Sequence, residues 1–351
     1  MGRATLTETK HAADPREIIV HSDPPPGFGA SGHPQPKHLP LLDGWRAVSI
    51  LLVMIGHLLP LGPSQWRLNG AVAACGMAIF FTLSGFLITS ILLRGTTVRT
   101  FLIRRLFRIV PLAWAAMLVL IFVNHASFEV SAANLTFVAN LPPVRLLFGG
   151  EHLWSLCVEV QFYAAIALLV ALAGRKALFA LPVLGICVTI IRVFNAAQFS
   201  IYTYERLDEI LAGCSLALIY RYAPGLRTPR LLAVALAPLA LASSHQSLGF
   251  LCYLRPYLVA AMVGSSLFGF PAPLLKVFAS RISRWIAEIS YGLYVFHGML
   301  ASTWLGSGVV LVKYAKRPLL VLLTFALAQG SYRYFEAPLQ RVGKRVEQRL
   351  S

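Results

Sequence analysis

The sequence predicts an all-α polytopic membrane protein, a bundle of about ten transmembrane helices, and three observations support this fold class. Hydrophobic residues make up 57% of the 351-residue chain and charged residues 13%, whereas about 25% of the residues in soluble domains are charged. Apolar runs long enough to cross a bilayer recur along the chain. The basic residues gather between these runs, as Lys and Arg do in membrane proteins.

The N-terminal segment differs from the rest because it is polar and contains the run "SDPPPGFGASGHPQP". This composition is typical of disorder, and the segment has neither the apolar core nor the cleavage site of a signal peptide. We expect a disordered cytoplasmic tail at 1–38, a membrane domain at 39–340 and a short cytoplasmic tail at 341–351.

Ten apolar runs of membrane length follow this tail. A shorter stretch from Asn134 to Val144 is interpreted as either a re-entrant segment or a loop helix. An even number of spans places both termini on the same side of the membrane. The ten runs cover residues 42–61, 72–93, 109–125, 153–173, 177–197, 206–222, 231–246, 249–270, 285–306 and 309–335.

The distribution of Lys and Arg predicts the orientation. With the N-terminus in the cytoplasm, 22 of the 31 basic residues fall in cytoplasmic segments and 5 in external ones. The basic stretch "KYAKR" at 313–317 is the exception, since it lies outside. We therefore relate the formal net charge of +17 to the bilayer and expect no nucleic-acid partner.

The five cysteines lie in or beside the apolar runs and lack metal-ligand spacing. We expect free thiols that behave as small apolar side chains, and no bound metal. The cysteines are Cys75, Cys157, Cys187, Cys214 and Cys252.

The first apolar run carries two ionisable side chains, Arg46 and His57. Their spacing corresponds to a rotation of about 1100°, roughly 20° past three full turns, so both project from one helix face. Ionisable groups within a span cost roughly 2.5–3.5 kcal/mol each and are functional candidates by default. A lone histidine can instead form a structural hydrogen bond between helices.

Two further ionisable residues reach a depth similar to that of His57. Measured from the cytoplasmic face, His57 lies at about 16 Å, His297 at about 18 Å and Glu159 at about 20 Å. The structural alternatives are a polar seam of His297 with Ser290 and Tyr294, and an ion pair of Glu159 with an arginine such as Arg206.

The cytoplasmic run "RTFLIRRLFRIVP" places Arg105 and Arg108 one helical turn apart. Arginines at this boundary can anchor a helix to lipid headgroups or bind phosphates with their guanidinium groups. The spacing alone does not decide between these roles.

The run "GMAIFFTLSGFLIT" contributes small residues that permit close helix packing. Within it, Ser84 is a candidate for a minor polar contact. The G-x-S-x-G nucleophile motif is missing, so a Ser–His–Asp triad has little support.

Seven stretches in the order "LDGWRAVSILLVMIGH", "FFTLSGFLIT", "RRLFRIVP", "LWSLCVEVQFY", "RLDEILAG", "SYGLYVFH" and "SYRYFEAPL" resemble the signature blocks of the acyltransferase 3 family. This resemblance covers the chain from about Pro40 to Arg341. It implies a bacterial inner (cell) membrane protein that transfers an acyl group, foremost acetyl, from cytoplasmic acyl-CoA to a hydroxyl of a surface carbohydrate or lipid-linked sugar. Acyl-CoA is then a co-substrate, with no bound cofactor. Some members carry a fused extracellular hydrolase-like domain, which we do not expect in this chain.

The resemblance also implies the site residues. The family's arginine and histidine, ten residues apart, match Arg46 and His57, its paired arginines match Arg105 and Arg108, and its acidic residue matches Glu159. The chain departs from the pattern at Val160, where a second acidic residue is common, and at Ala47, where glycine is usual. The predicted catalytic residues are His57, Glu159 and Arg46, the acyl-CoA-binding residues are Arg105 and Arg108, and the supporting candidates are Asp43, Ser84, Tyr163, Arg206 and His297.

The resulting hypothesis has the arginines bind the phosphates of CoA and His57 act as general base, oriented by Glu159. An acyl-His57 intermediate is the covalent alternative. The rival class is a transporter or exporter that uses the intramembrane His, Glu and Arg as a proton relay. A structural protein of a polysaccharide export complex is the third interpretation.

Overall fold

The computed structural model describes residues 39–350, and every regular element in this range is a helix. The predicted tail at 1–38 and Ser351 lie outside the described residues. The α-helices are α1 (Pro40–Leu58), α2 (Leu68–Leu93), α3 (Val98–Asn124), α4 (Phe128–Leu135), α5 (Trp154–Ala173), α6 (Leu181–Phe194), α7 (Thr203–Tyr222), α8 (Leu232–Ala242), α9 (Arg255–Phe268), α10 (Ala272–Phe278), α11 (Arg281–Ala301), α12 (Val310–Ala315), α13 (Arg317–Ser331) and α14 (Ala337–Leu350). The 3₁₀ segments are η1 (Ser64–Trp66), η2 (Glu151–Leu153), η3 (Arg175–Ala180), η4 (Gln246–Leu254) and η5 (Trp304–Gly306), and the π-helical turn η6 (Tyr332–Glu336) joins α13 to α14.

Six helical segments among the described residues are long and apolar enough to cross a membrane. A helix satisfies its backbone hydrogen bonds internally, which is the condition for spanning lipid. The predicted class, an all-α polytopic membrane protein, is therefore confirmed. The six segments are Pro40–Leu58, Ser64–Leu93, Val98–Asn124, Glu151–Ala173, Arg175–Phe194 and Gln246–Phe268.

The other four predicted spans also form helices, but each falls short in length or apolar character. Helix α8 has 11 residues, about 16 Å against a hydrocarbon core of about 30 Å. Helix α13 has 15 residues and continues through η6 into α14. Helix α11 begins with the charged stretch from Arg281 to Glu288. Helix α7 carries Glu205, Arg206, Asp208 and Glu209 in its first two turns. Length and composition thus support six spans where the sequence predicts about ten.

The segment between α3 and α5 is largely irregular. Of the stretch from Asn134 to Val144, interpreted as a re-entrant segment or a loop helix, only Asn134 and Leu135 are helical, at the end of α4. The chain then runs through turns to η2, which leads directly into α5. Asn134 holds this segment together because its Nδ2 donates to the carbonyl oxygens of Val130 and Arg145 at 2.8 and 2.6 Å.

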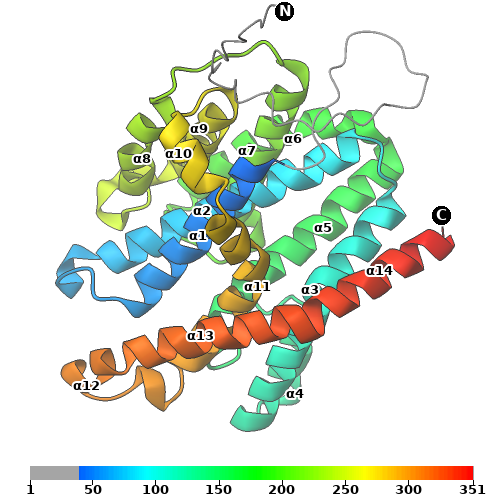
Figure 1. Ribbon diagram of the computed structural model, residues 1–351. Coiled ribbons are helices and arrows are strands. Elements are labelled where there is room, and N and C mark those ends of the chain that lie inside the picture. Colours follow the sequence, from blue (N-terminus) through cyan, green and yellow to red (C-terminus); the bar gives the residue numbers. More distant parts are fainter. Residues whose placement is uncertain (1–38, 351) are drawn as a thin grey trace, which may run out of the picture.

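Helix α2 packs closely against α1 on one side and α7 on the other (Figure 1). A Cβ added to Gly76 would lie 2.7 Å from the carbonyl oxygen of Ser49 in α1. A Cβ added to Gly85 would overlap the carbonyl oxygen of Ile210 in α7. Both glycines belong to the run "GMAIFFTLSGFLIT", so the prediction that its small residues permit close helix packing is confirmed.

The C-terminal helices α13 and α14 follow one another through η6 as one long rod that passes α3 (Figure 1). Arg104 of α3 joins the rod with a forked contact, in which Nε and Nη2 donate to the two carboxylate oxygens of Glu347 at 2.6 and 2.7 Å. The predicted C-terminal tail at 341–351 is helical as far as Leu350, where α14 ends.

The five cysteines are free thiols, as the sequence predicts. Cys187 on α6 is exposed and the other four are buried. Buried free cysteines act as small apolar side chains in a helical core.

Candidate active site

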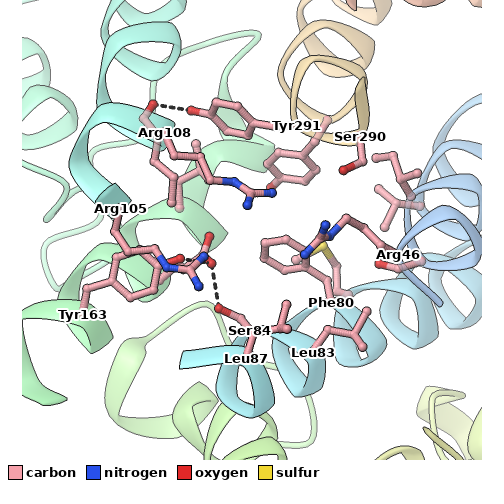
Figure 2. A pocket seen from close by; sticks show the side chains of 18 residues that line it. Arg46, Phe80, Leu83, Ser84, Leu87, Arg105, Arg108, Tyr163, Ser290 and Tyr291 are labelled. Atoms are coloured by element: carbon pink, nitrogen blue, oxygen red, sulfur yellow. Dashed lines mark hydrogen bonds between the residues drawn. The ribbon is translucent and has the colours of Figure 1, made fainter. Parts of the chain in front are cut away.

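A cavity opens between α1, α2, α3, α5 and α11, with about 730 Å³ of atom-free space, part of it open to the outside. Its walls are mainly apolar, but polar side chains from all five helices converge on it (Figure 2). Such a combination is typical of ligand sites. The polar lining residues are Arg46, Ser49, Ser84, Arg105, Arg108, Glu159, Tyr163, Ser290, Tyr291 and Tyr294.

Three arginines direct their guanidinium groups into the cavity, Arg46 from α1 and Arg105 and Arg108 from α3 (Figure 2). The two α3 residues are three positions apart and so share a helix face. Within residues 39–350, none of the three lies within ion-pairing distance of a carboxylate. The guanidinium carbon of Arg105 lies 5.7 Å from the ring centre of Tyr163. Three cations facing the carboxylate of Glu159 give the cavity an excess of positive charge.

Glu159 on α5 is 5% exposed and is held by two hydroxyl groups. Ser84 on α2 donates from Oγ to its Oε1 at 2.7 Å, and the Tyr163 hydroxyl donates to the same oxygen. These bonds bring together Ser84, Tyr163 and Glu159, three of the site residues that the sequence analysis names as candidates. Glu159 is hydrogen-bonded neither to His57 nor to Arg206 in this arrangement, so the expected orientation of His57 by Glu159 is not present.

His57 lies beyond the end of the cavity, on the α1 face that carries Arg46. Residues Arg46, Ser49, Ile50 and Val53 of that face line the cavity, and His57 follows Val53 by about one turn. The His57 side chain is exposed. Arg46 and His57 therefore share a face, as their spacing predicts.

His57 pairs with His297 of α11, which is fully buried. Nδ1 of His57 lies 3.0 Å from Nε2 of His297. The two rings are nearly parallel, with centroids 5.2 Å apart and an interplanar angle of 3°, so they meet edge to edge through these nitrogens. The sequence predicts a similar depth for these two histidines, and the structure brings their rings into contact; we call them the histidine pair.

A third histidine, His152 in η2, completes this region, and the sequence reasoning missed it. Its ring packs edge-on against His297, with centroids 4.9 Å apart, and its Nε2 lies 3.1 Å from the carbonyl oxygen of Val295. Tyr294 donates its hydroxyl to the His152 carbonyl oxygen, and its hydroxyl lies 2.6 Å from Ser155 Oγ. The available signal was the position of His152 two residues before "WSL", but His152 lies outside the apolar run.

Besides His297, two further supporting candidates lie away from the cavity wall. Arg206 is 3% exposed and sits in a buried ionic cluster, with Nη1 3.3 Å from Glu209 Oε1. Its guanidinium group also lies over the rings of Phe81 and Trp154. Asp43 lies in the first turn of α1, half-buried. Arg206 thus supports the helices around the site rather than lining it.

The fold and the site together define a polytopic helical membrane protein whose positively charged cavity ends beside a pair of imidazoles. Comparison with known proteins agrees with this class. The acyltransferase 3 model, described as an acyltransferase domain, matches residues 39–330. The chain belongs to the acyltransferase 3 family, and the resemblance found in the sequence is confirmed.

The curated relatives include O-acetyltransferases by name. The peptidoglycan O-acetyltransferase OatA of Listeria monocytogenes is 26% identical over 88% of this chain and 56% of its own length. The putative peptidoglycan O-acetyltransferase YrhL of Bacillus subtilis shows the same identity and coverage, and a putative O-acetyltransferase of Staphylococcus aureus is 24% identical over 90% of this chain and 59% of its own. The chain thus spans less than two thirds of the length of these relatives. No solved structure matches it significantly.

Proposed function

We propose that this protein is a membrane O-acyltransferase that moves an acetyl group from acetyl-CoA to a hydroxyl of a carbohydrate. The observation that carries the proposal is the convergence of Arg46, Arg105 and Arg108 in one cavity that ends one helical turn before His57. An anion site beside a base suits a donor whose phosphates bind at one end and whose thioester reacts at the other.

The donor proposal follows from the chemistry of the cavity. Guanidinium groups bind phosphate oxygens through paired, charge-assisted hydrogen bonds, and CoA carries several phosphates at the end remote from its thiol. Arg46 and Arg105 both lie about 9–11 Å from the N-terminal ends of their helices. In the proposed topology these ends are cytoplasmic, where acyl-CoA is available.

The topology is part of the proposal. Ten spans, with both termini in the cytoplasm of a bacterial inner membrane, account for the excess of basic residues in the segments assigned to the inside. In this arrangement α7, α8, α11 and α13 also cross or enter the membrane, and the charged residues in the first two turns of α7 are buried within the helices.

The reaction proceeds at His57. Its imidazole takes the proton of the acceptor hydroxyl as that oxygen attacks the thioester carbonyl carbon. The carbon–sulfur bond then breaks, and the imidazolium returns the proton to the departing thiolate. An acyl-His57 intermediate would use the same ring nitrogen as a nucleophile. Glu159 contributes a negative charge within the cavity, held in place by Ser84 and Tyr163.

The acceptor proposal draws on the relatives, whose names specify peptidoglycan. We infer a carbohydrate acceptor of that class, an exopolysaccharide, an O-antigen or a lipid-linked oligosaccharide, which approaches His57 from the side opposite to the arginines. The exposure of His57 supports such an approach.

The test uses the full chain in lipid nanodiscs with acetyl-CoA and a soluble peptidoglycan fragment. We expect acceptor-dependent release of free thiol, which His57→Ala abolishes while folding is retained. His125→Asn is the matched control, because His125 is exposed at the end of α3 in a left-handed conformation that Asn tolerates. Full activity of His57→Ala would refute the mechanism. Carbohydrate transport without thiol release would favour the transporter or exporter instead.

A further inference from the structure

The backbone contacts of His297 determine which of its ring nitrogens carries the hydrogen. Its Nδ1 lies 2.7 Å from the carbonyl oxygen of Tyr294 and 3.2 Å from that of Leu293. A carbonyl oxygen only accepts hydrogen bonds, so Nδ1 donates. A neutral imidazole has one ring hydrogen, and Nε2 of His297 is therefore an acceptor.

This assignment determines the tautomer of His57. Because Nε2 of His297 accepts, the His57 Nδ1 at 3.0 Å donates to it. A neutral His57 then has its lone pair on Nε2. That nitrogen lies on the side of the ring away from His297, and His57 as a whole is an exposed residue.

We propose that His297 is a positioning residue that keeps His57 in its Nδ1–H tautomer and presents the Nε2 lone pair to the acceptor hydroxyl. The proposal rests on the function proposed above, in which His57 is the base. The hydroxyl proton moves to His57 Nε2 as the oxygen bonds to the thioester carbon, and it leaves with the thiolate sulfur when the carbon–sulfur bond breaks.

His297 gains and loses no proton in this sequence. Its Nε2 accepts from His57 Nδ1–H throughout, and the bond becomes charge-assisted while His57 is an imidazolium. A carboxylate performs this orienting task in Ser–His–Asp triads. Here a neutral imidazole does so, and its own Nδ1–H is bound to the backbone of α11.

The surroundings hold His297 in this orientation. Besides the hydrogen-bonded ring of His57, the rings of His152 and Tyr294 lie with their centroids 4.9 and 5.7 Å away. The position of His152 in turn depends on Gly298, where a Cβ would overlap the imidazole of His152. The His297 ring has little room to rotate, which fixes the direction of its Nε2.

A pure packing role for His297 is the competing explanation, and substitutions separate the two. Gln carries an amide oxygen that can accept from His57 Nδ1 and an amide nitrogen that can donate to the α11 backbone. Leu has a similar volume but can do neither. His297→Gln should therefore preserve the orienting bond, whereas His297→Leu should preserve only the packing.

Steady-state kinetics of full-length protein in nanodiscs, with acetyl-CoA and a peptidoglycan fragment, provides the first test. In His297→Leu we expect kcat to fall by roughly 10²-fold or more, the scale of general-base catalysis. The KM for acetyl-CoA should change by less than about twofold, since His297 does not line the cavity. His297→Gln should recover at least about tenfold in kcat over His297→Leu. Equal kcat values in the two variants would overturn the proposal.

A spectroscopic test does not depend on activity. In protein labelled with ¹⁵N-histidine, with the His57 signals assigned by their loss in His57→Gln, we expect neutral His57 to be protonated on Nδ1. In His297→Leu the Nε2–H form, which predominates in free histidine, should replace it. An Nε2–H tautomer of His57 in the wild type would overturn the proposal. Absence of thiol release by the wild type would instead refute the proposed function, and the tautomer measurement would still decide the role of His297.

Discussion

Ser84 Oγ on α2 donates a 2.7 Å hydrogen bond to Glu159 Oε1 on α5. The hydroxyl of Tyr163, one turn further along α5, donates to the same oxygen. Two helices therefore set the position of one carboxylate, in the cavity that the three arginines also line. Glu159 is thus a fixed negative charge at a site whose other charged groups are cations.

This relationship predicts that Glu159→Gln lowers kcat without weakening donor binding. The amide preserves size and the two hydrogen bonds but removes the negative charge, so the cavity attracts anions at least as strongly as before. We expect a loss of roughly tenfold or more in kcat with an unchanged or lower KM for acetyl-CoA. Ser84→Ala, which leaves the Tyr163 hydroxyl in place, should have a smaller effect. A raised KM with a normal kcat would contradict this assignment.

The arginines of α3 predict the opposite kinetic pattern. Arg105→Ala or Arg108→Ala should raise the KM for acetyl-CoA roughly ten- to a hundredfold, since a charge-assisted hydrogen bond contributes about 1.5–3 kcal/mol. The effect on kcat should be smaller. Arg221→Ala, at the exposed end of α7, is the matched control. As a second measurement, removal of the 3′-phosphate from acetyl-CoA should weaken its binding to the wild type. The same removal should weaken binding less in the variant that lacks the arginine contacting this phosphate. An unchanged KM in both arginine variants would exclude the phosphate role.

Much of the site could be predicted because helix geometry relates sequence spacing directly to space. Arg46 and His57 share a face of α1, and Arg105 and Arg108 enter the cavity from one face of α3. The meeting of His57 with a residue of α11 followed from depth, which depends only on the rise per residue and the direction of each span.

Other features could not be predicted, since depth does not specify how a helix is rotated about its axis. The rotation of α5 directs Glu159 to Ser84 and away from His57. His152 lies in a 3₁₀ turn outside the apolar runs, where helical periodicity gives no information. The charged residues of α7 lower the number of clearly apolar spans. Asp208 and Glu209 of α7 form ion pairs with Arg192 of α6 and Arg255 of α9, and only the fold brings these partners together.

The contact between Arg104 and Glu347 predicts a pH-dependent attachment of α14. The hydrogen bonds from Arg104 lower the pKa of Glu347 below its usual value. A lowered carboxyl pKa in the folded state means that the contact stabilises the fold above the ordinary pKa of about 4.3 and is lost as pH falls through the lower value. The protection factors of the α14 amides, which correct for the slower intrinsic exchange in acid, should therefore fall at acidic pH in the wild type. In Glu347→Gln they should be lower already at neutral pH and respond little to acid. Identical exchange in both proteins at neutral pH would show that this contact does not hold α14.

The ionic cluster of α7 predicts a large difference between two chemically identical substitutions. Glu209 is fully buried, accepts from Arg255 Nε at 2.6 Å and lies 3.3 Å from Arg206 Nη1. Glu129 lies 3.0 Å from Arg145, but its side chain is 71% exposed. Removal of one partner from a buried ion pair leaves an uncompensated charge and costs about 3–5 kcal/mol, whereas a surface pair contributes about 0–1 kcal/mol.

Glu209→Gln should therefore lower the midpoint of thermal unfolding strongly, and Glu129→Gln should leave it nearly unchanged. A thiol-reactive dye can follow unfolding, because four of the five cysteines are buried, and Cys187→Ser removes the exposed one from the background. If the two Gln variants unfold at the same temperature, the buried cluster does not stabilise the α6–α7–α9 region. Loss of activity in Glu209→Gln would then have to come from Arg206, whose guanidinium group lies over Phe81 and Trp154 beside the site.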